Sequence, residues 1–262
     1  MISTSGTARL SYPAVALLAL LAAPAAADDL ETDSSDWDIM LGAGAMLAPR
    51  YEGSDRFTVM PLPVIDVVWR DRLFLNSFNG LGIYALNRDD LQLGISINYD
   101  FGRSESDDRR HLGGLGDVDA AAQGKIFASY GWNGIELSAE VAHSFGGSDG
   151  TLVEAGIGYP IALGERLSVT PGFSASWADE DYMAAYFGVS ASQSANSGLS
   201  PFAADAGFKD IDLTLDARYM LTEHWALGLR VGAGYLLGDA ADSPVTQERV
   251  QPYSILSVVY RF

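Results

Sequence analysis

Residues 91–101 read LQLGISINYDF, and the side chains alternate strictly along this stretch. Every odd position is apolar, and every even position is polar or glycine. A period of two places these sets on opposite faces of a β-strand, whereas a helix would mix them. A strand of this length with one wholly apolar face is typical of a tilted crossing of a lipid bilayer, which takes about 9–11 residues.

The same alternation recurs in residues 135–145, 167–177 and 208–221. The links between the strands are alternately short and long along the chain. Short links are expected at residues 70–72, 87–90, 131–134, 164–166 and 222–224, and long links at residues 49–56, 102–118, 146–150, 178–207 and 238–249. Outer-membrane barrels alternate tight periplasmic turns with extended outer loops in this way.

The sequence therefore predicts an all-β protein, a transmembrane antiparallel β-barrel of about twelve strands over residues 37–262. Twelve strands require Leu73–Phe78 and Leu81–Leu86 to be two short strands joined at Asn79-Gly80, a dipeptide suited to a type I′ turn. Because both segments are short for a full crossing, ten strands is the alternative. Either even number places both ends of the barrel in the periplasm.

Aromatic residues gather at the expected strand ends. The set beside the short turns is Trp37, Trp69, Trp132, Tyr219, Trp225, Tyr260 and Phe262, and the set at the opposite ends is Tyr99, Phe101, Phe145, Trp177 and Tyr235. Two such belts are expected at the two interfaces of a bilayer. Val258, Tyr260 and Phe262 alternate up to the last residue, as in the C-terminal signal that the barrel assembly machinery reads.

Residues 1–27 are expected to be a cleaved signal peptide. They carry one positive charge at Arg9, an apolar stretch from Ala14 to Ala23, and small residues at 25–27. Residues 28–36 are acidic and polar, and we expect a short periplasmic N-terminal segment there. The predicted location is the outer membrane of a Gram-negative bacterium, where lipid and lipopolysaccharide surround the barrel.

The composition excludes several classes of protein. The formal net charge is -18, and Lys125 and Lys209 are the only lysines, so no basic patch for a nucleic-acid partner is present in the sequence. The chain has no cysteine. A thiolate nucleophile, a cysteine zinc site and a lipoprotein anchor are excluded with it.

From about Trp37 to Phe262 the chain resembles the MltA-interacting protein family, also called MipA/OmpV. Two loop motifs carry much of the resemblance, namely Pro49, Tyr51, Gly53, Ser54 and Asp55 in the first, and Gly238, Asp239, Ala240, Asp242, Ser243 and Pro244 in the second. Further matches lie at residues 101–103, 113–117, 186–189, 193–195, 197–199 and 260–262. The joint order of these pieces is more specific than any one of them.

The resemblance implies a non-enzymatic scaffold that holds a lytic transglycosylase and a bifunctional murein synthase together at the cell envelope. Other members of the family are described as osmotically regulated or immunogenic surface proteins. A narrow channel for small solutes is the alternative function, because many Ser, Gly, Asp and Arg residues are expected to face the lumen.

No catalytic, cofactor or metal residues are predicted. Glu136 and Glu140 share a strand face but lie about 13 Å apart along it, too far to flank one glycosidic bond. His143 and Ser144 point to opposite faces, which disfavours a lipase. Asp239 and Asp242 are weaker candidates for a calcium or lipopolysaccharide-bridging site. The inward acids Asp66, Asp100, Glu154, Asp212 and Asp216 are expected to pair with Arg70, Lys125, Arg218, Arg230 and Arg261.

Overall fold

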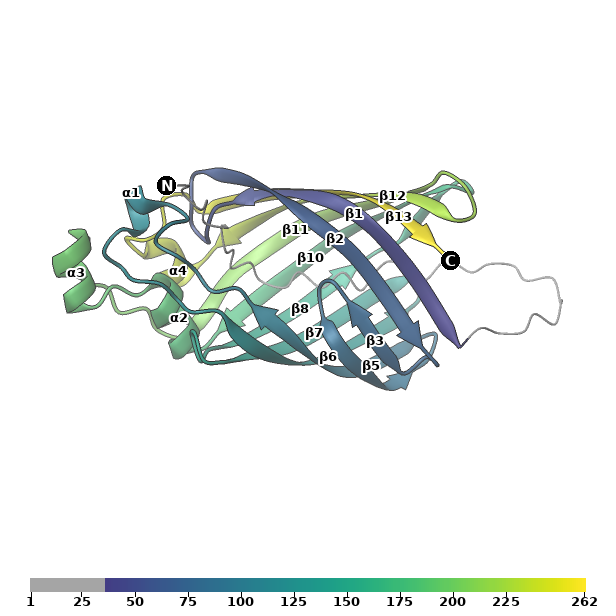
Figure 1. Ribbon diagram of the computed structural model, residues 1–262, viewed down its shortest axis with the longest axis horizontal. Helices are drawn as coiled ribbons and strands as arrows, with labels where there is room; N and C mark the ends of the chain where they lie inside the picture. Colours follow the sequence, from purple (N-terminus) through teal and green to yellow (C-terminus); the bar gives the residue numbers. More distant parts are fainter. Residues whose placement is uncertain (1–35) are drawn as a thin grey trace, which may run out of the picture.

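The computed structural model describes residues 36–262, and the chain forms one barrel with four short helices at one end (Figure 1). The predicted signal peptide and all but the last residue of the segment 28–36 lie outside the described residues. The strands are β1 (Trp37–Pro49), β2 (Phe57–Trp69), β3 (Leu73–Asn76), β4 (Gly80–Asn87), β5 (Leu91–Asp100), β6 (Ala121–Trp132), β7 (Ile135–Phe145), β8 (Thr151–Gly158), β9 (Ile161–Leu163), β10 (Leu167–Ala178), β11 (Gly207–Met220), β12 (Trp225–Leu236) and β13 (Val250–Arg261).

Neighbours in the sequence pair antiparallel, and β1 pairs with β13 to close the sheet. The short strand β9 continues β8, because both pair with β10 and are separated only by Tyr159 and Pro160. Proline has no N–H to give to a ladder, which accounts for an interruption at this point. The thirteen segments therefore make a closed barrel of twelve strand positions, and the twelve-strand prediction is confirmed over the ten-strand alternative.

The hairpin of β3 and β4 exists as predicted, but its turn differs. Asn76 pairs with Gly80, so three residues form the loop. The Asn76 side-chain oxygen accepts hydrogen bonds from the N–H groups of Phe78 and Asn79, at 3.0 and 2.7 Å. A type I′ turn needs positive φ at both central residues, whereas at this dipeptide only Gly80 has one, of 73°. The type I′ prediction is wrong because the Asn76 side chain organises a longer loop.

The two ends of the barrel differ. At the loop end, the long links contain α1 (Arg109–Leu112), α2 (Glu180–Phe187), α3 (Ala191–Ser197) and α4 (Gly238–Asp242). At the turn end the links are short, and the chain finishes there (Figure 1). Within residues 36–262, every helix is too short or too polar to cross a membrane.

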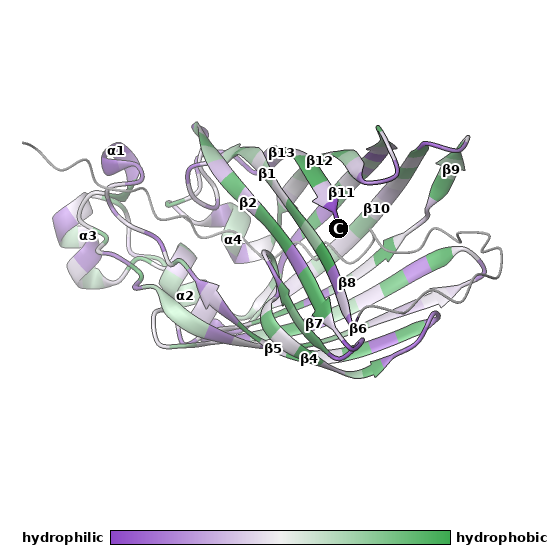
Figure 2. Cartoon of the chain, turned by 45° about the vertical axis from the view of Figure 1, so that its right-hand side comes forward, coloured by the Kyte–Doolittle hydropathy of each residue, from purple (hydrophilic) through white to green (hydrophobic). Residues whose placement is uncertain are grey.

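The outward face of the strands is apolar. The largest exposed fractions include Ile97 at 67%, Val59 at 68% and Leu213 at 64%, and green bands mark the strands in Figure 2. Both aromatic belts contribute, with Trp132 and Phe262 exposed at the turn end and Tyr99 and Phe145 exposed towards the loop end. A surface with this much exposed apolar area is stable in lipid, which confirms the membrane-barrel prediction.

Side chains that are far apart in the sequence pack together inside the lumen. The rings of Phe74, Tyr84 and Phe127 pack together inside the barrel, with Phe74 and Tyr84 centroids 4.6 Å apart. Gly82 and Gly94 lie directly against this cluster: a Cβ on Gly94 would come 2.3 Å from the Phe127 ring. These glycines leave the room that the rings occupy.

One ion pair of the predicted set is present between Arg230 and Asp216. Arg230 Nε lies 2.6 Å from Asp216 Oδ1. Lys125 instead pairs with Glu140 at 3.0 Å, and Arg70 and Arg261 pair with Asp36 and Asp38 at the exposed turn end. The pairings differ because the register between strands, which the sequence alone does not give, decides which charges meet.

Filling the space beside Phe127 should destabilise the barrel. We expect Gly94→Val to lower the free energy of unfolding by about 1–3 kcal/mol, since overpacking displaces the aromatic cluster. Urea unfolding in lipid vesicles measures it. Gly131→Val is the control, because the nearest atom to its Cβ is 4.0 Å away. Equal unfolding midpoints for the two variants would show that the aromatic cluster can move aside without a loss of stability.

Candidate functional site

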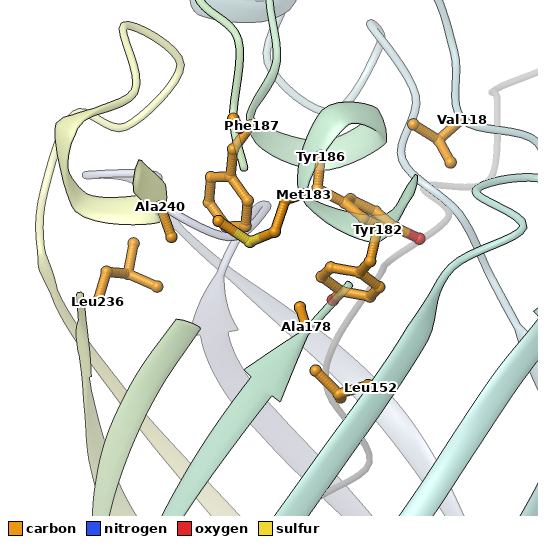
Figure 3. Packing of buried hydrophobic residues seen from close by; sticks show 10 residues of the cluster. Val118, Leu152, Ala178, Tyr182, Met183, Tyr186, Phe187, Leu236 and Ala240 are labelled. Atoms are coloured by element: carbon orange, nitrogen blue, oxygen red, sulfur yellow. The ribbon is translucent and has the colours of Figure 1, made fainter. Parts of the chain in front are cut away.

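The loop end of the barrel is closed by a packed cap built around α2. Tyr182, Met183, Tyr186 and Phe187 are at most 6% exposed and pack against residues of the strand ends and of α4 (Figure 3). Asp179 caps the helix by accepting from the Tyr182 N–H. The helix reaches across the mouth, because the Tyr182 hydroxyl donates to Glu52 after β1 and the Tyr186 hydroxyl donates to Asp100 of β5.

A buried charge cluster lies beneath this cap. Lys209 is fully buried at the start of β11, and its Nζ donates to Glu52 Oε1 at 2.8 Å and to Asp210. Ser176 donates to the other Asp210 oxygen at 2.7 Å. Burial raises the pKa of the Glu52 carboxyl above its ordinary value, and the charge of Lys209 opposes this shift. One lysine thus compensates the buried carboxylate of Glu52 and the partly buried carboxylate of Asp210.

The first family motif forms the cap's contact with the last loop. Tyr51 is 1% exposed and donates to the Val245 carbonyl at 3.3 Å. Gly53 has φ of +91° and lies so close to Thr246 that a Cβ would be 2.7 Å from its hydroxyl. The Gly53 N–H donates to the Gln251 side chain at 3.0 Å. Pro49 and Ser54 are also buried, whereas Asp55 is exposed.

The second motif lies in and after α4. Ala240 is fully buried under Phe187, and Ser243 donates to the Phe187 carbonyl at 2.5 Å and accepts from the Val245 N–H. Gly238 has φ of +48° and Pro244 precedes Val245 in the same loop. The two motifs, almost 190 residues apart, are therefore brought together in one cap.

The two weaker candidates for a cation site, Asp239 and Asp242, each contact a different part of the chain. Asp239 accepts from the Asp205 N–H at 2.8 Å, and Asp242 pairs with Arg249 at 2.7 Å on the surface. A different group, Asp55, Asp108 and His111, has ligand atoms within 4.8 Å of one another. Asp108 already pairs with Arg56 and His111, each at 3.3 Å, so a guanidinium supplies the positive charge there.

The other residues considered for chemistry also have structural contacts. His143 Nδ1 lies 3.1 Å from the Thr151 hydroxyl, and His224 Nδ1 lies 3.1 Å from the Arg261 carbonyl oxygen. Val258 and Phe262 are outward and exposed. The ring of Tyr260 is 4.8 Å from that of Phe262, so the proposed assembly signal forms an aromatic group on the lipid-facing wall.

The lumen holds a cavity of about 440 Å³ that reaches the turn end. Its charged lining is mostly acidic and consists of Asp71, Arg88, Asp89, Asp90, Glu136, Glu154, Asp216 and Arg230. Glu154 also lines a smaller cavity of about 70 Å³ next to Glu52 and Asp210, beneath the cap. The barrel is thus open and acidic at the turn end and closed at the loop end.

Sequence reasoning missed the cap and its charge cluster. A signal was present in residues 179–187, DEDYMAAYF, because an Asp cap precedes an apolar helical turn. The lysine among many acids was a second signal. Neither shows which loop the helix would cover.

The family model described as MltA-interacting protein MipA matches residues 41–262. Among curated proteins, the putative outer membrane protein YiaT of Escherichia coli strain K12 is 31% identical over 132 residues, or 50% of this chain and 52% of the relative. The putative outer membrane protein YiaT of Escherichia coli O157:H7 matches with the same identity and coverage. The chain spans about half the length of the curated relatives it matches.

Solved structures are similar at low sequence identity. The COG4313 outer membrane channel from Pseudomonas putida F1 has a TM-score of 0.46 at 13% identity, over 90% of this chain and 100% of that chain. The KdgM porin has a TM-score of 0.43 at 7% identity, over 85% and 99%.

Removing the buried lysine should open the cap. We expect Lys209→Met to lower the free energy of unfolding by about 3–5 kcal/mol, because the buried Glu52 and the partly buried Asp210 lose their shared counter-charge. Urea unfolding and protease cleavage of the loops measure the loss. Arg249→Met is the control, since it breaks an exposed pair worth at most about 1 kcal/mol. Similar behaviour of the two variants would mean that the cluster contributes little.

Proposed function

The chain belongs to the MltA-interacting protein MipA family, and from this premise we propose that it is a non-enzymatic scaffold that holds murein-cleaving and murein-synthesising enzymes together. The barrel lies in the outer membrane. The family's name describes a protein that interacts with MltA, and the partners proposed here are a lytic transglycosylase and a bifunctional murein synthase.

The observation that carries the proposal is the difference between the two ends of the lumen. In an outer-membrane barrel the short turns face the periplasm and the long loops face outward. The cap of α2 therefore closes the outer side, while the acidic cavity opens towards the periplasm, where such enzymes work. A protein that is accessible from one side only suits binding better than passage.

The periplasmic surface offers charge for recognition. The turn 88–90 places Arg88, Asp89 and Asp90 at the mouth of the acidic cavity. A basic segment of a partner is complementary to this surface, and charges at the rim of an interface mainly speed association and set the specificity. The predicted periplasmic N-terminal segment 28–36 precedes β1, which begins at the turn end, and is a second proposed contact.

Reversing the rim charge should weaken partner capture. We expect Asp89→Lys combined with Asp90→Lys to lower the affinity for a lytic transglycosylase by about tenfold, and the wild-type interaction to weaken with added salt. Pull-down from periplasmic extract with the purified barrel, followed by titration, measures both.

The matched control reverses two exposed acids at the outer end, Asp119→Lys with Asp205→Lys. These residues lie on loops that a periplasmic partner does not reach. Equal capture by both double variants and the wild type would contradict binding at the periplasmic rim.

A narrow channel is the second candidate, because Glu154 connects the periplasmic cavity with the space beneath the cap. We expect the refolded wild type to be silent in a planar bilayer, and a variant lacking residues 180–198 to conduct, since α2 then no longer covers the mouth. Steady unitary conductance from the wild type would put the channel ahead of the scaffold.

A further inference from the structure

One wall of the lumen is lined by polar side chains from neighbouring strands. The strands β7, β8, β10 and β11 lie side by side in the barrel (Figure 1). Leu137, Phe173 and Leu213 on these strands are outward and exposed. Because side chains alternate along a strand, the residues between them face the lumen. The inward polar residues that line the cavity of about 440 Å³ are Glu136, Ser138, Thr170, Ser174, Thr214 and Asp216.

Two glycines form the floor on which these side chains converge. Gly158 and Gly172 line the same cavity. A Cβ on Gly172 would come 2.5 Å from the Thr214 hydroxyl oxygen. A Cβ on Gly158 would lie 3.3 Å from Thr170 Cγ2 and 3.9 Å from a carboxylate oxygen of Glu136. Polar groups of three different strands are therefore brought close together over a floor without side chains of its own.

Much of the hydrogen-bonding capacity at this floor is unused. Within residues 36–262, the side chains of Glu136, Thr170 and Thr214 have no hydrogen-bond or ion-pair partner. Arg230 is 5% exposed, and its Nε and Nη2 donate to Asp216 at 2.6 and 2.9 Å. Its Nη1 is buried and finds no acceptor in the part of the chain that the structure describes, although buried polar groups are normally bonded. The cavity thus presents both a free donor and free acceptors.

The charges restrict which ligand can use these groups. Asp216 balances Arg230, and the remaining lining is mostly acidic, so an anion is disfavoured. A simple ammonium ion could pair with Glu136, but it has no oxygen to accept from Arg230 Nη1. A hydroxyl group can donate to a carboxylate and accept from a guanidinium. A neutral molecule with several hydroxyl groups therefore matches the donors and acceptors at this floor.

The cavity is large enough for one ring that carries such hydroxyl groups. Its volume of about 440 Å³ is about three times that of a cavity of roughly 150 Å³ that accepts benzene. It also lies within the range of about 300–1,000 Å³ that is usual for small-molecule sites. A six-membered sugar ring with its substituents has room here.

We propose that this cavity is a binding site for a neutral monosaccharide that enters from the periplasm. The sugar ring lies over Gly172, one hydroxyl group donates to Glu136, and another accepts from Arg230 Nη1. The hydroxyl groups of Thr170 and Thr214 supply further hydrogen bonds. Because the cap of α2 closes the loop end, the sugar enters and leaves by the turn end. This binding activity goes beyond the scaffold role and requires no partner protein.

The test measures sugar binding to the full barrel in phosphatidylcholine nanodiscs by isothermal titration calorimetry, with empty nanodiscs as the baseline. Glucose, galactose, mannose and N-acetylglucosamine are the neutral probes, and glucosamine and glucuronate are charged probes built on the same ring. We expect at least one neutral sugar to bind, and glucuronate to bind at least roughly tenfold more weakly, since the acidic lining repels it. Binding of none of the neutral sugars, or of glucosamine alone, would overturn the proposal.

Three substitutions that preserve side-chain shape test the contacts. We expect Thr170→Val and Thr214→Val each to weaken binding of the neutral sugar about two- to tenfold, as for the loss of one neutral hydrogen bond. Glu136→Gln should weaken it at least about tenfold, because a hydrogen bond to a charged group is lost.

Thr58→Val is the matched control. Thr58 lies between the exposed residues Phe57 and Val59 of β2, so it faces the lumen, but it is not part of the cavity lining. We expect its affinity for the sugar to equal that of the wild type. Urea unfolding midpoints identify any variant that has lost stability. Equal sugar affinity of all four variants with unchanged midpoints would overturn the assignment of the site to this cavity.

Discussion

The structure depends on one constraint: in lipid, every backbone N–H and C=O must find its partner within the chain. Pairing of β1 with β13 and of β10 with β11 meets it by closing the sheet. Even the break at Tyr159 and Pro160 is bridged, because β9 resumes pairing with β10 at Ile161.

Closure of the barrel wall does not determine whether either end of the lumen is open or covered. At the loop end, Lys209 and Glu52 are buried together beside the partly buried Asp210, and removing one member of such a group leaves a buried charge without its partner. Residues of both family motifs surround this cluster. The motifs are thus explained physically as parts of a cap whose contacts depend on one another, and the periplasmic end is left as the accessible side.

The lumen holds two adjoining cavities. Glu136 and Glu154 line the larger one, Leu62, Val64 and Ile255 line the smaller one, and Asp216 and Arg230 line both. The larger, acidic cavity reaches the turn end, where it presents charge to the proposed periplasmic partner.

The sequence by itself determined the barrel and the two aromatic belts and favoured twelve strands over ten, because the alternation in stretches such as residues 91–101 is a local property. It also located the short β3–β4 hairpin. The turn at Asn79-Gly80, the partners of Lys125 and Lys209, and the cap were decided only by the tertiary structure. Each depends on register and on loops that meet across the barrel mouth, and contacts between residues as distant as Glu52 and Lys209 leave no periodic signal in the sequence.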